Sequence, residues 1–261
     1  MKTEILSLSR FGDLLYMLTW RDIHIRYKQS VMGFLWAILT PSMVVGAGVI
    51  VRIGVSRYSG QPISTNDLAS VMVRAVAWTF FITSLRFGTN SLLSNIQLVT
   101  KVAFPKEIFP VSAVLSSLFD FSIAGFALLI ALVVMGWLPS FHVLWTIPLM
   151  AMLVVFTAGL TMLLSAANLF FRDVKYIVDI ILNYAIFFTP VLYDISFVGR
   201  WKNIVMLNPV APVMEGLSNA VVDHVNPDPY WTTYTAVVSV VLFVYGYWQF
   251  KHLEYKFAET I

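Results

Sequence analysis

The chain has 261 residues, of which 59% are hydrophobic and 12% are charged, and it contains no cysteine. A soluble globular protein carries roughly 25% charged residues, so this composition indicates an integral membrane protein. The net charge is only +3 and the basic residues lie beside apolar blocks, which argues against a nucleic-acid-binding surface. The lack of cysteine excludes disulfides, thiolate nucleophiles and zinc–thiolate sites.

The first predicted element is an amphipathic helix within residues 11–30. Two stripes run side by side along it at helical spacing, an apolar one of Tyr16, Trp20, Ile23 and Tyr27 and a cationic one of Arg21, His24 and Lys28. Aromatic residues beside cations are typical of a helix that lies in the headgroup layer of a membrane. The alternative is a charged flank that only fixes the orientation of the first membrane-spanning helix.

Six apolar blocks follow, at residues 33–55, 68–93, 108–135, 143–169, 176–192 and 232–250. Each approaches the ~20 residues with which a helix crosses ~30 Å of hydrocarbon. The fifth block is the shortest and ends at Thr189 and Pro190. We therefore expect an all-α integral membrane protein with six transmembrane helices in a single domain, 1–261. Residues 1–32 would form the cytoplasmic interfacial helix, 33–250 the six-span region and 251–261 a cytoplasmic tail.

Positive charges predict the orientation of these spans. With the amino terminus inside, the inside segments carry Lys2, Arg10, Arg21, Arg26, Lys28, Lys101, Lys106, Arg172, Lys175, Lys251 and Lys256. The outside segments carry only Arg57, Arg200 and Lys202, while Arg52, Arg74 and Arg86 lie within or at the edges of spans and are not counted. Because cytoplasmic loops are enriched in Lys and Arg, we expect both termini to be cytoplasmic.

Two charged residues lie inside the second and third spans. By the 1.5 Å rise, Arg86 is ~12 Å and Asp120 ~16 Å from the cytoplasmic ends of their helices. Charges at this depth are costly in lipid and pair with each other or face a cavity. We therefore predict an intramembrane Arg86–Asp120 ion pair. The rival interpretation is that Arg86 faces a conduit and binds the phosphate of an anionic lipid.

The segment between the second and third spans predicts a short helix on the cytoplasmic side. Asn95 can act as its N-cap, residues 96–102 form one or two turns, and Pro105 ends them. A short capped helix makes a rigid protrusion that a soluble partner could bind, although most such segments are only connections.

Polar and aromatic side chains share one side of the fifth span. Asp179, Asn183 and Pro190 recur at helical spacing on one face, with Tyr184, Phe187 and Phe188 nearby. Such a face can line a wet path whose rings stack on sugars, and helix packing accounts for it equally well.

The segment 193–230 is long for a connection. Two amphipathic pieces, 201–207 and 210–222, are separated by Asn208 and Pro209. They predict either a re-entrant pair that dips back into the membrane or a surface loop with two short helices.

Motifs of nucleotide binding and hydrolysis are absent from the sequence. It contains no G-x-x-x-x-G-K-[ST], H-E-x-x-H or G-x-S-x-G motif, and its histidines (His24, His142, His224 and His252) are scattered. Any energy source is therefore expected on another subunit.

Several segments, in order along the chain, carry a family resemblance. They are 21–37, 95–110 with the run Lys101-Val-Ala-Phe-Pro-Lys-Glu107, 168–176 followed by Thr189-Pro190-Val-Leu-Tyr193, and the pair Asn208-Pro209. They resemble the opening, the cytoplasmic coupling segment, the junction of spans four and five, and the re-entrant outer segment of a known family. That family comprises the permease subunits of ABC transporters that export O-antigen, capsule or teichoic acid.

The resemblance implies a homodimer of six-span subunits in the bacterial cytoplasmic (inner) membrane, paired with two copies of a separate ABC ATPase. ATP and Mg would be bound by that partner, and no cofactor by this chain. A lipid-linked polysaccharide would enter from the cytoplasmic leaflet and pass through a channel at the dimer interface. The chain is thus expected to be a transport subunit and not an enzyme, with membrane lipids and polymer as further partners and no nucleic acid.

Three sets of site residues follow from the resemblance together with the patterns above. The ATPase-coupling set is Asn95, Lys101, Phe104, Pro105, Lys106, Glu107, Arg21, Arg26 and Tyr27. The conduit set is Arg86, Asp179, Asn183, Tyr184, Phe187, Phe188 and Tyr193. The outer re-entrant gate set is Trp201, Asn208, Pro209 and Glu215. No catalytic or metal-binding residue is expected.

The sequence departs from the family pattern in two places. After Asn208 and Pro209 the family commonly has an arginine following a phenylalanine, where this chain has Leu217 and Ser218. Arg86 stands where a small or apolar residue is expected, so its role does not follow from the resemblance.

Two other functional classes compete with a transport subunit. An integral-membrane glycosyl- or acyltransferase would need clustered acids or a histidine at a membrane-embedded site, and the sequence shows neither cluster. A passive channel or structural membrane protein would need no ATPase. An ATPase that co-purifies with the chain and is stimulated by it would distinguish these classes from an exporter.

Overall fold

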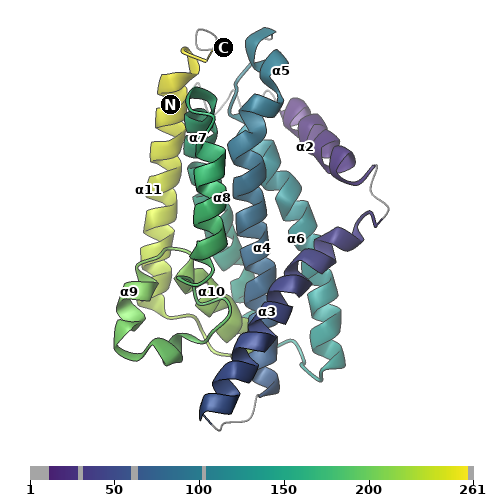
Figure 1. The fold of residues 1–261 in the computed structure, drawn as a ribbon, viewed down its shortest axis with the longest axis vertical. Coiled ribbons are helices and arrows are strands. Elements are labelled where there is room, and N and C mark those ends of the chain that lie inside the picture. Colours follow the sequence, from purple (N-terminus) through teal and green to yellow (C-terminus); the bar gives the residue numbers. More distant parts are fainter. Residues whose placement is uncertain (1–11, 29–31, 60–63, 102–103, 258–261) are drawn as a thin grey trace.

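The computed structural model describes residues 12–28, 32–59, 64–101 and 104–257, and Figure 1 draws the remaining residues as a thin grey trace. Parts of the predicted interfacial helix (1–11 and 29–31) and of the tail (258–261) thus lie outside the described residues. The long helices are α2 (Gly12–Tyr27), α3 (Leu35–Ser59), α4 (Thr65–Ser94), α6 (Ile108–Val134), α7 (Thr146–Phe170), α8 (Val174–Ala185) and α11 (Pro229–Glu254). The short elements are α5 (Ile96–Lys101), η1 (Phe141–Trp145), η2 (Ile195–Trp201), α9 (Lys202–Met206), α10 (Ala211–Ser218) and η3 (Asn219–Asp223). Every regular element of the described residues is helical, which confirms the all-α part of the predicted fold class.

Four helical stretches are long and apolar enough to cross a membrane. They are Leu35–Gly54, Thr65–Ser94, Ile108–Val134 and Phe141–Phe170. They coincide with the first four predicted spans. The sixth predicted span corresponds to α11, which is 26 residues long. It is not one of these four stretches.

The expected continuous helix over residues 176–192 is wrong. α8 has 12 residues and ends at Ala185, after which residues 186–191 form turns. Proline lacks an amide hydrogen and disfavours a helical conformation in the residue before it, so Pro190 disfavours continuation of the helix through residues 189 and 190. At 1.5 Å per residue α8 covers only ~18 Å, less than the ~30 Å hydrocarbon core.

α4 is the central helix of the bundle and contacts α3, α6, α7, α8 and α10. Its start is fixed by a capping box, in which Ser64 Oγ accepts the Asn66 amide and Asp67 Oδ2 accepts the Ser64 amide, both at 3.2 Å. Its middle is buried, with Trp78 and Phe80 almost fully enclosed. This burial follows from the helices that surround α4.

α7 and α11 approach each other at two glycines. A Cβ atom on Gly159 would lie 2.6 Å from the Phe243 Cα, and one on Gly246 would lie 2.4 Å from the Gly159 carbonyl oxygen. Small residues allow helix backbones to pack directly against each other in membrane proteins. These two glycines therefore set the spacing of α7 and α11.

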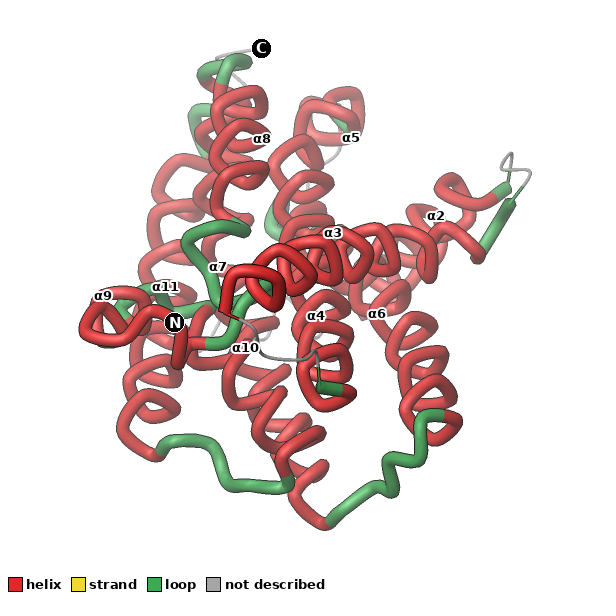
Figure 2. The backbone as a smooth tube through the Cα atoms, turned by 60° about the horizontal axis from the view of Figure 1, so that its bottom comes forward, coloured by secondary structure: helices red, strands yellow, loops and turns green. Residues whose placement is uncertain are grey.

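The bundle has two distinct ends, which we call the α5 end and the α9 end. In Figure 1 the upper, α5 end carries α2, α5 and the last turns of α11, and the lower, α9 end carries α9 and α10. α3 runs obliquely across α4, as Figure 2 shows with the α9 end turned forward. An apolar cluster closes the α5 end: Leu18, Leu92, Val99, Ile108, Phe109, Met162, Ala166, Leu169, Phe250 and Phe257.

Candidate functional site

A cavity of about 590 Å³ lies among α2, α3, α4, α6 and α8. Five charged residues line it: Arg26, Arg86, Lys175, Asp120 and Asp179. Its remaining lining includes hydroxyl, amide and aromatic side chains, among them Thr83, Asn90, Trp36 and Phe87. A cavity with charged walls inside an apolar bundle is the structural feature in which an amphipathic ligand can be held.

Arg86 pairs with α8 across this cavity. Its Nε lies 3.1 Å from Asp179 Oδ1, and its Nη2 donates a hydrogen bond of 2.6 Å to Asn183 Oδ1. Asp179 and Asn183 are one turn apart and so present both oxygens on the same face of α8. The sequence had placed both residues in the conduit set, and the structure brings them together with Arg86.

The predicted Arg86–Asp120 ion pair is wrong. Asp120 instead pairs with Arg26 and accepts a hydrogen bond from the Tyr27 hydroxyl, both from α2. The prediction rested on similar depth in neighbouring helices, but depth does not determine which way a side chain points around the helix axis. The guanidinium of Arg26 also stacks over Phe87, 4.0 Å from the ring centroid.

The aromatic residues of the conduit set do not line the cavity. Tyr184, Phe187 and Phe188 are exposed on α8 and the turn after it. The Tyr193 hydroxyl donates to the Phe187 carbonyl at 3.3 Å. The structure thus separates these rings from the charged residues with which the sequence grouped them.

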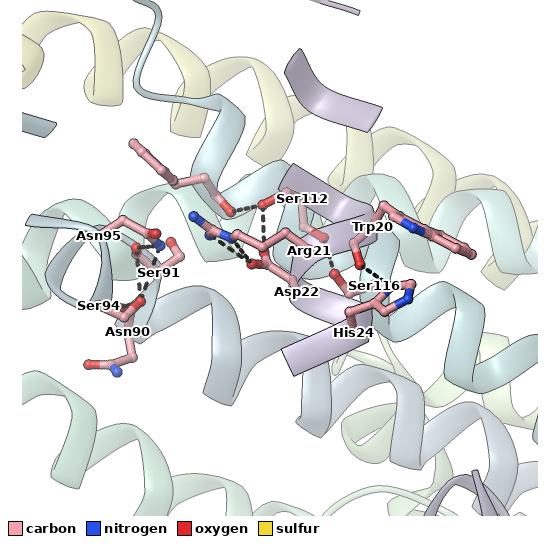
Figure 3. A network of polar contacts seen from close by, with 11 residues as sticks. Trp20, Arg21, Asp22, His24, Asn90, Ser91, Ser94, Asn95, Ser112 and Ser116 are labelled. Atoms are coloured by element: carbon pink, nitrogen blue, oxygen red, sulfur yellow. Dashed lines mark hydrogen bonds and ion pairs between the residues drawn. The ribbon is translucent and has the colours of Figure 1, made fainter. Parts of the chain in front are cut away.

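α2 is fixed to α6 by polar contacts, although the sequence assigned its polar residues to a partner. The Ser112 hydroxyl of α6 donates to Asp22 at 3.1 Å, and Asp22 also accepts Arg21 Nη2 at 2.8 Å, as Figure 3 shows. Burial and the hydrogen bond to Asp120 raise the pKa of Tyr27. Of the predicted apolar stripe, Ile23 is buried, whereas Tyr16 and Trp20 remain exposed.

Asn95 joins α4 to α5, but it is not the side-chain cap that the sequence predicted. Its backbone ends α4, and its side-chain amide donates to the Ser91 carbonyl at 2.9 Å (Figure 3). The helix that follows ends at Lys101, and residues 102–103 lie outside the described residues. Val99 of α5 is buried against the bundle, while Leu98 and Lys101 are exposed.

Glu107, a member of the predicted ATPase-coupling set, is buried in the structure. Its side chain is fully buried, and its Oε2 accepts a hydrogen bond of 2.8 Å from Lys251 of α11. Lys251 also bonds Glu254 at 2.9 Å, and Glu254 Oε1 accepts the Lys106 amide at 2.9 Å. The loop position of Glu107 gave no sign that the last turn of α11 covers it.

The other candidates at this end are also partly enclosed. Lys106 is buried with its Nζ 4.4 Å from the Phe104 ring centroid, and Phe104 packs against Phe109. Burial raises the pKa of Glu107, and the hydrogen bond from Lys251 opposes the rise only in part. The ion pair therefore supports a carboxylate that would otherwise be disfavoured here.

Lys251→Met is expected to destabilise the protein on the order of 3 kcal/mol, because it leaves Glu107 buried without its cation. The melting temperature of the purified protein measures this loss. As the pH falls through the raised pKa of Glu107, the carboxyl group takes up a proton and the deficit should shrink. The double variant Lys251→Met, Glu107→Gln should recover most of the stability. A double variant no more stable than Lys251→Met would contradict this assignment.

Arg74 organises the α9 end, and sequence reasoning assigned it no role. It is 1% exposed, its Nη1 donates to the Tyr193 carbonyl at 2.9 Å, and its Nη2 bonds Glu215 at 3.0 Å and Asp194 at 3.4 Å. Burial acts to raise the pKa of Asp194, but hydrogen bonds from Ser196 and Arg74 outweigh it and lower that pKa. The sequence signal that could have indicated this network was an arginine inside the second predicted span together with two acids, Asp194 and Glu215, after the fifth.

The predicted gate residues flank a fixed turn. Asn208 Nδ2 donates to the Thr189 hydroxyl at 2.9 Å, and Asn208 Oδ1 accepts the Val210 amide at 3.1 Å. The Pro209 carbonyl accepts the Thr235 hydroxyl at 3.2 Å. Two short helical pieces on either side of this turn are confirmed, as α9 and as α10 with η3. Glu215 lies on α10 and Trp201 is exposed at the end of η2.

Comparisons with known proteins match almost the whole chain. The sequence profile described as "ABC-2 type transporter" matches residues 13–222. The chain is 30% identical over 258 residues to the "O-antigen export system permease protein RfbA" of Myxococcus xanthus, covering 98% of each. It is also 27% identical over 266 residues to a protein of the same name from Klebsiella pneumoniae, covering 98% of this chain and 97% of that protein.

Proposed function

Because the chain belongs to the ABC-2 type transporter family, we propose that it is the membrane-spanning subunit of an ATP-driven exporter of a lipid-linked polysaccharide. The observation that carries the proposal is the end-to-end likeness to O-antigen export permeases, which covers 98% of this chain and 98% of the first relative. The chain is a multi-pass membrane protein, and the polymer is an O-antigen or a chemically similar glycan.

The proposed topology has six membrane crossings with both termini in the cytoplasm of a bacterial inner membrane. α11 supports a further crossing, because its 26 residues cover ~39 Å at 1.5 Å per residue. α8 reaches part of the way, and α9, α10 and η3 would form the re-entrant segment that follows it. The inside bias of Lys and Arg supports this orientation, and with it a cytoplasmic position for the α5 end.

The proposed assembly contains two copies of this chain and two copies of a separate ABC ATPase, which would bind ATP and Mg. The absence of a G-x-x-x-x-G-K-[ST] motif from the sequence supports a separate ATPase. α8 presents an apolar face of Ile177, Ile180 and Ile181 that no other described element covers, and a second copy could bury it. The exposed side of α5, with Leu98 and Lys101, is the proposed ATPase contact.

Surface polysaccharide in a strain that lacks the chromosomal copy tests this function. The wild-type chain should restore surface polymer, whereas Lys101→Glu should reduce it at least several-fold, because a reversed charge weakens docking of the ATPase. Arg57→Glu is the matched control, since Arg57 is also an exposed basic residue but lies in the last turn of α3, away from α5. Membrane content of each variant is measured by immunoblot.

Two results would contradict different parts of the proposal. A wild-type chain that restores no surface polymer would overturn the proposed function. A Lys101→Glu variant that exports normally and still co-purifies with the ATPase would overturn the α5 contact alone.

A further inference from the structure

Two ion pairs in the cavity wall differ in how well they are enclosed. The side chains of Arg26 and Asp120 are 17% and 16% exposed, and Tyr27 adds a hydrogen bond to the same carboxylate. The side chains of Arg86 and Asp179 are 42% and 52% exposed. The first pair is therefore a packed structural contact between α2 and α6, whereas the second can be reached from the cavity.

An exposed ion pair holds its members only weakly, because each charge can exchange its partner for water or for another ion. A replacement partner must enter the cavity that Arg86 and Asp179 line. By the 1.5 Å rise, Arg86 is ~12 Å from the α5 end of α4. A carboxylate is a single negative charge, and a phosphate group with more charge and more oxygens is a stronger partner for a guanidinium.

The cavity wall has one more cation than it has carboxylates. Arg26, Arg86 and Lys175 face two acids. Lys175 forms no ion pair with a carboxylate of the described residues, and its Nζ lies 4.8 Å from the centroid of its neighbour Tyr176. Because Lys175 is one turn before Asp179 on α8, the two lie on the same face of that helix. Lys175 and Arg86 therefore flank Asp179.

We propose that Arg86 and Lys175 form a binding site for a phosphate group inside the cavity, with Asp179 as the occupant that the phosphate replaces. The site rests on the proposed function, since it assigns the residues that would receive the phosphate of a lipid-linked substrate. Asn183 keeps the guanidinium oriented when Asp179 leaves, because its hydrogen bond to Arg86 is independent of that carboxylate. The Asp179 side chain is 52% exposed, so water can reach its carboxylate after it is displaced.

The test uses the complete permease–ATPase complex in phosphatidylcholine vesicles that contain a minor fraction of phosphatidic acid. Native mass spectrometry measures the phosphatidic acid retained per complex. Arg86→Met and Lys175→Met should each lower retention about tenfold, as expected for one charge-assisted contact. Asp179→Asn should raise retention about threefold, because it removes a competing carboxylate of an exposed pair.

The matched control is Asp67→Asn, which removes the acid of another interhelical ion pair, the 3.2 Å contact between Arg52 of α3 and Asp67 of α4. Retention should not change in this variant. A second arm replaces phosphatidic acid with soluble inorganic diphosphate in pure phosphatidylcholine vesicles. Binding only in the first arm assigns the phosphate to a lipid, and binding only in the second assigns it to a soluble anion.

Unchanged retention in Arg86→Met, or lower retention in Asp179→Asn, would overturn the site. So would an Asp179→Asn variant that loses its second copy while phosphatidic acid retention stays the same, because the pair would then be an interface between copies. Surface polysaccharide is measured in the same variants. If the wild-type chain binds phosphatidic acid as described yet restores no polymer, the proposed function fails and the phosphate site remains.

Discussion

Replacing Arg74 with methionine is expected to produce the largest loss of stability among single substitutions in the chain. The guanidinium bonds the Tyr193 carbonyl and two carboxylates, and its side chain is 1% exposed. Removing one member of a buried ionic network costs roughly 3–5 kcal/mol, because the remaining charges are left without a partner. The melting temperature and membrane yield of the purified variant measure this effect.

Two further variants separate loss of charge from loss of geometry. Arg74→Met with Glu215→Gln should recover part of the stability, since Glu215 is the more enclosed of the two acids. Arg200→Met removes an exposed arginine that only stacks near the Trp201 ring at 5.4 Å, so it should be nearly neutral. An Arg74→Met protein that melts with the wild type would show that the outer segment does not depend on this residue.

The second large effect is expected for Gly246→Ala. Its new Cβ would meet the Gly159 carbonyl oxygen at 2.4 Å, and this backbone atom cannot move aside as a flexible side chain does. α7 and α11 would have to separate, and overpacking of this kind costs about 1–3 kcal/mol or more. Gly159→Ala should act in the same direction, because its Cβ would lie 2.6 Å from the Phe243 Cα. Thermal unfolding in detergent measures both.

Gly125→Ala provides the control on α6. A Cβ at Gly125 has no neighbour within 4 Å, and alanine is favoured over glycine in a helix by about 1 kcal/mol. This variant should be neutral or slightly more stable. If Gly246→Ala were equally tolerated, the close approach of α7 and α11 would not be needed for stability.

The positions of the long helices could be predicted from the sequence because apolar blocks determine them. The predicted span 108–135 appears as Ile108–Val134, and 68–93 appears as Thr65–Ser94. α8 could not be predicted as a short helix from hydropathy alone, because residues 186–192 are as apolar as the helix that they follow. Pro190 was the sequence signal for a shorter helix, because proline removes a backbone hydrogen bond without making the segment less apolar.

The polar contacts were harder to predict because they join residues that are distant in sequence. Arg74 is separated from Tyr193 by 119 residues and from Glu215 by 141. Asp120 was expected to meet Arg86, and the alternative, Arg26, is 94 residues away on a helix assigned to the membrane surface. Which of two acids an arginine meets depends on helix rotation, and a single sequence does not determine this.

The attachments of α5 have a mechanical consequence. On one side Asn95 follows α4 without a flexible linker and bonds back to Ser91. On the other side the Lys106 amide is held by Glu254 of α11. A force applied to α5 therefore acts directly on the end of α4, to which α5 is joined at Asn95. Because α4 is a single rod of 30 residues, its tilt carries that force to Arg74 at the far end, where the outer segment is attached.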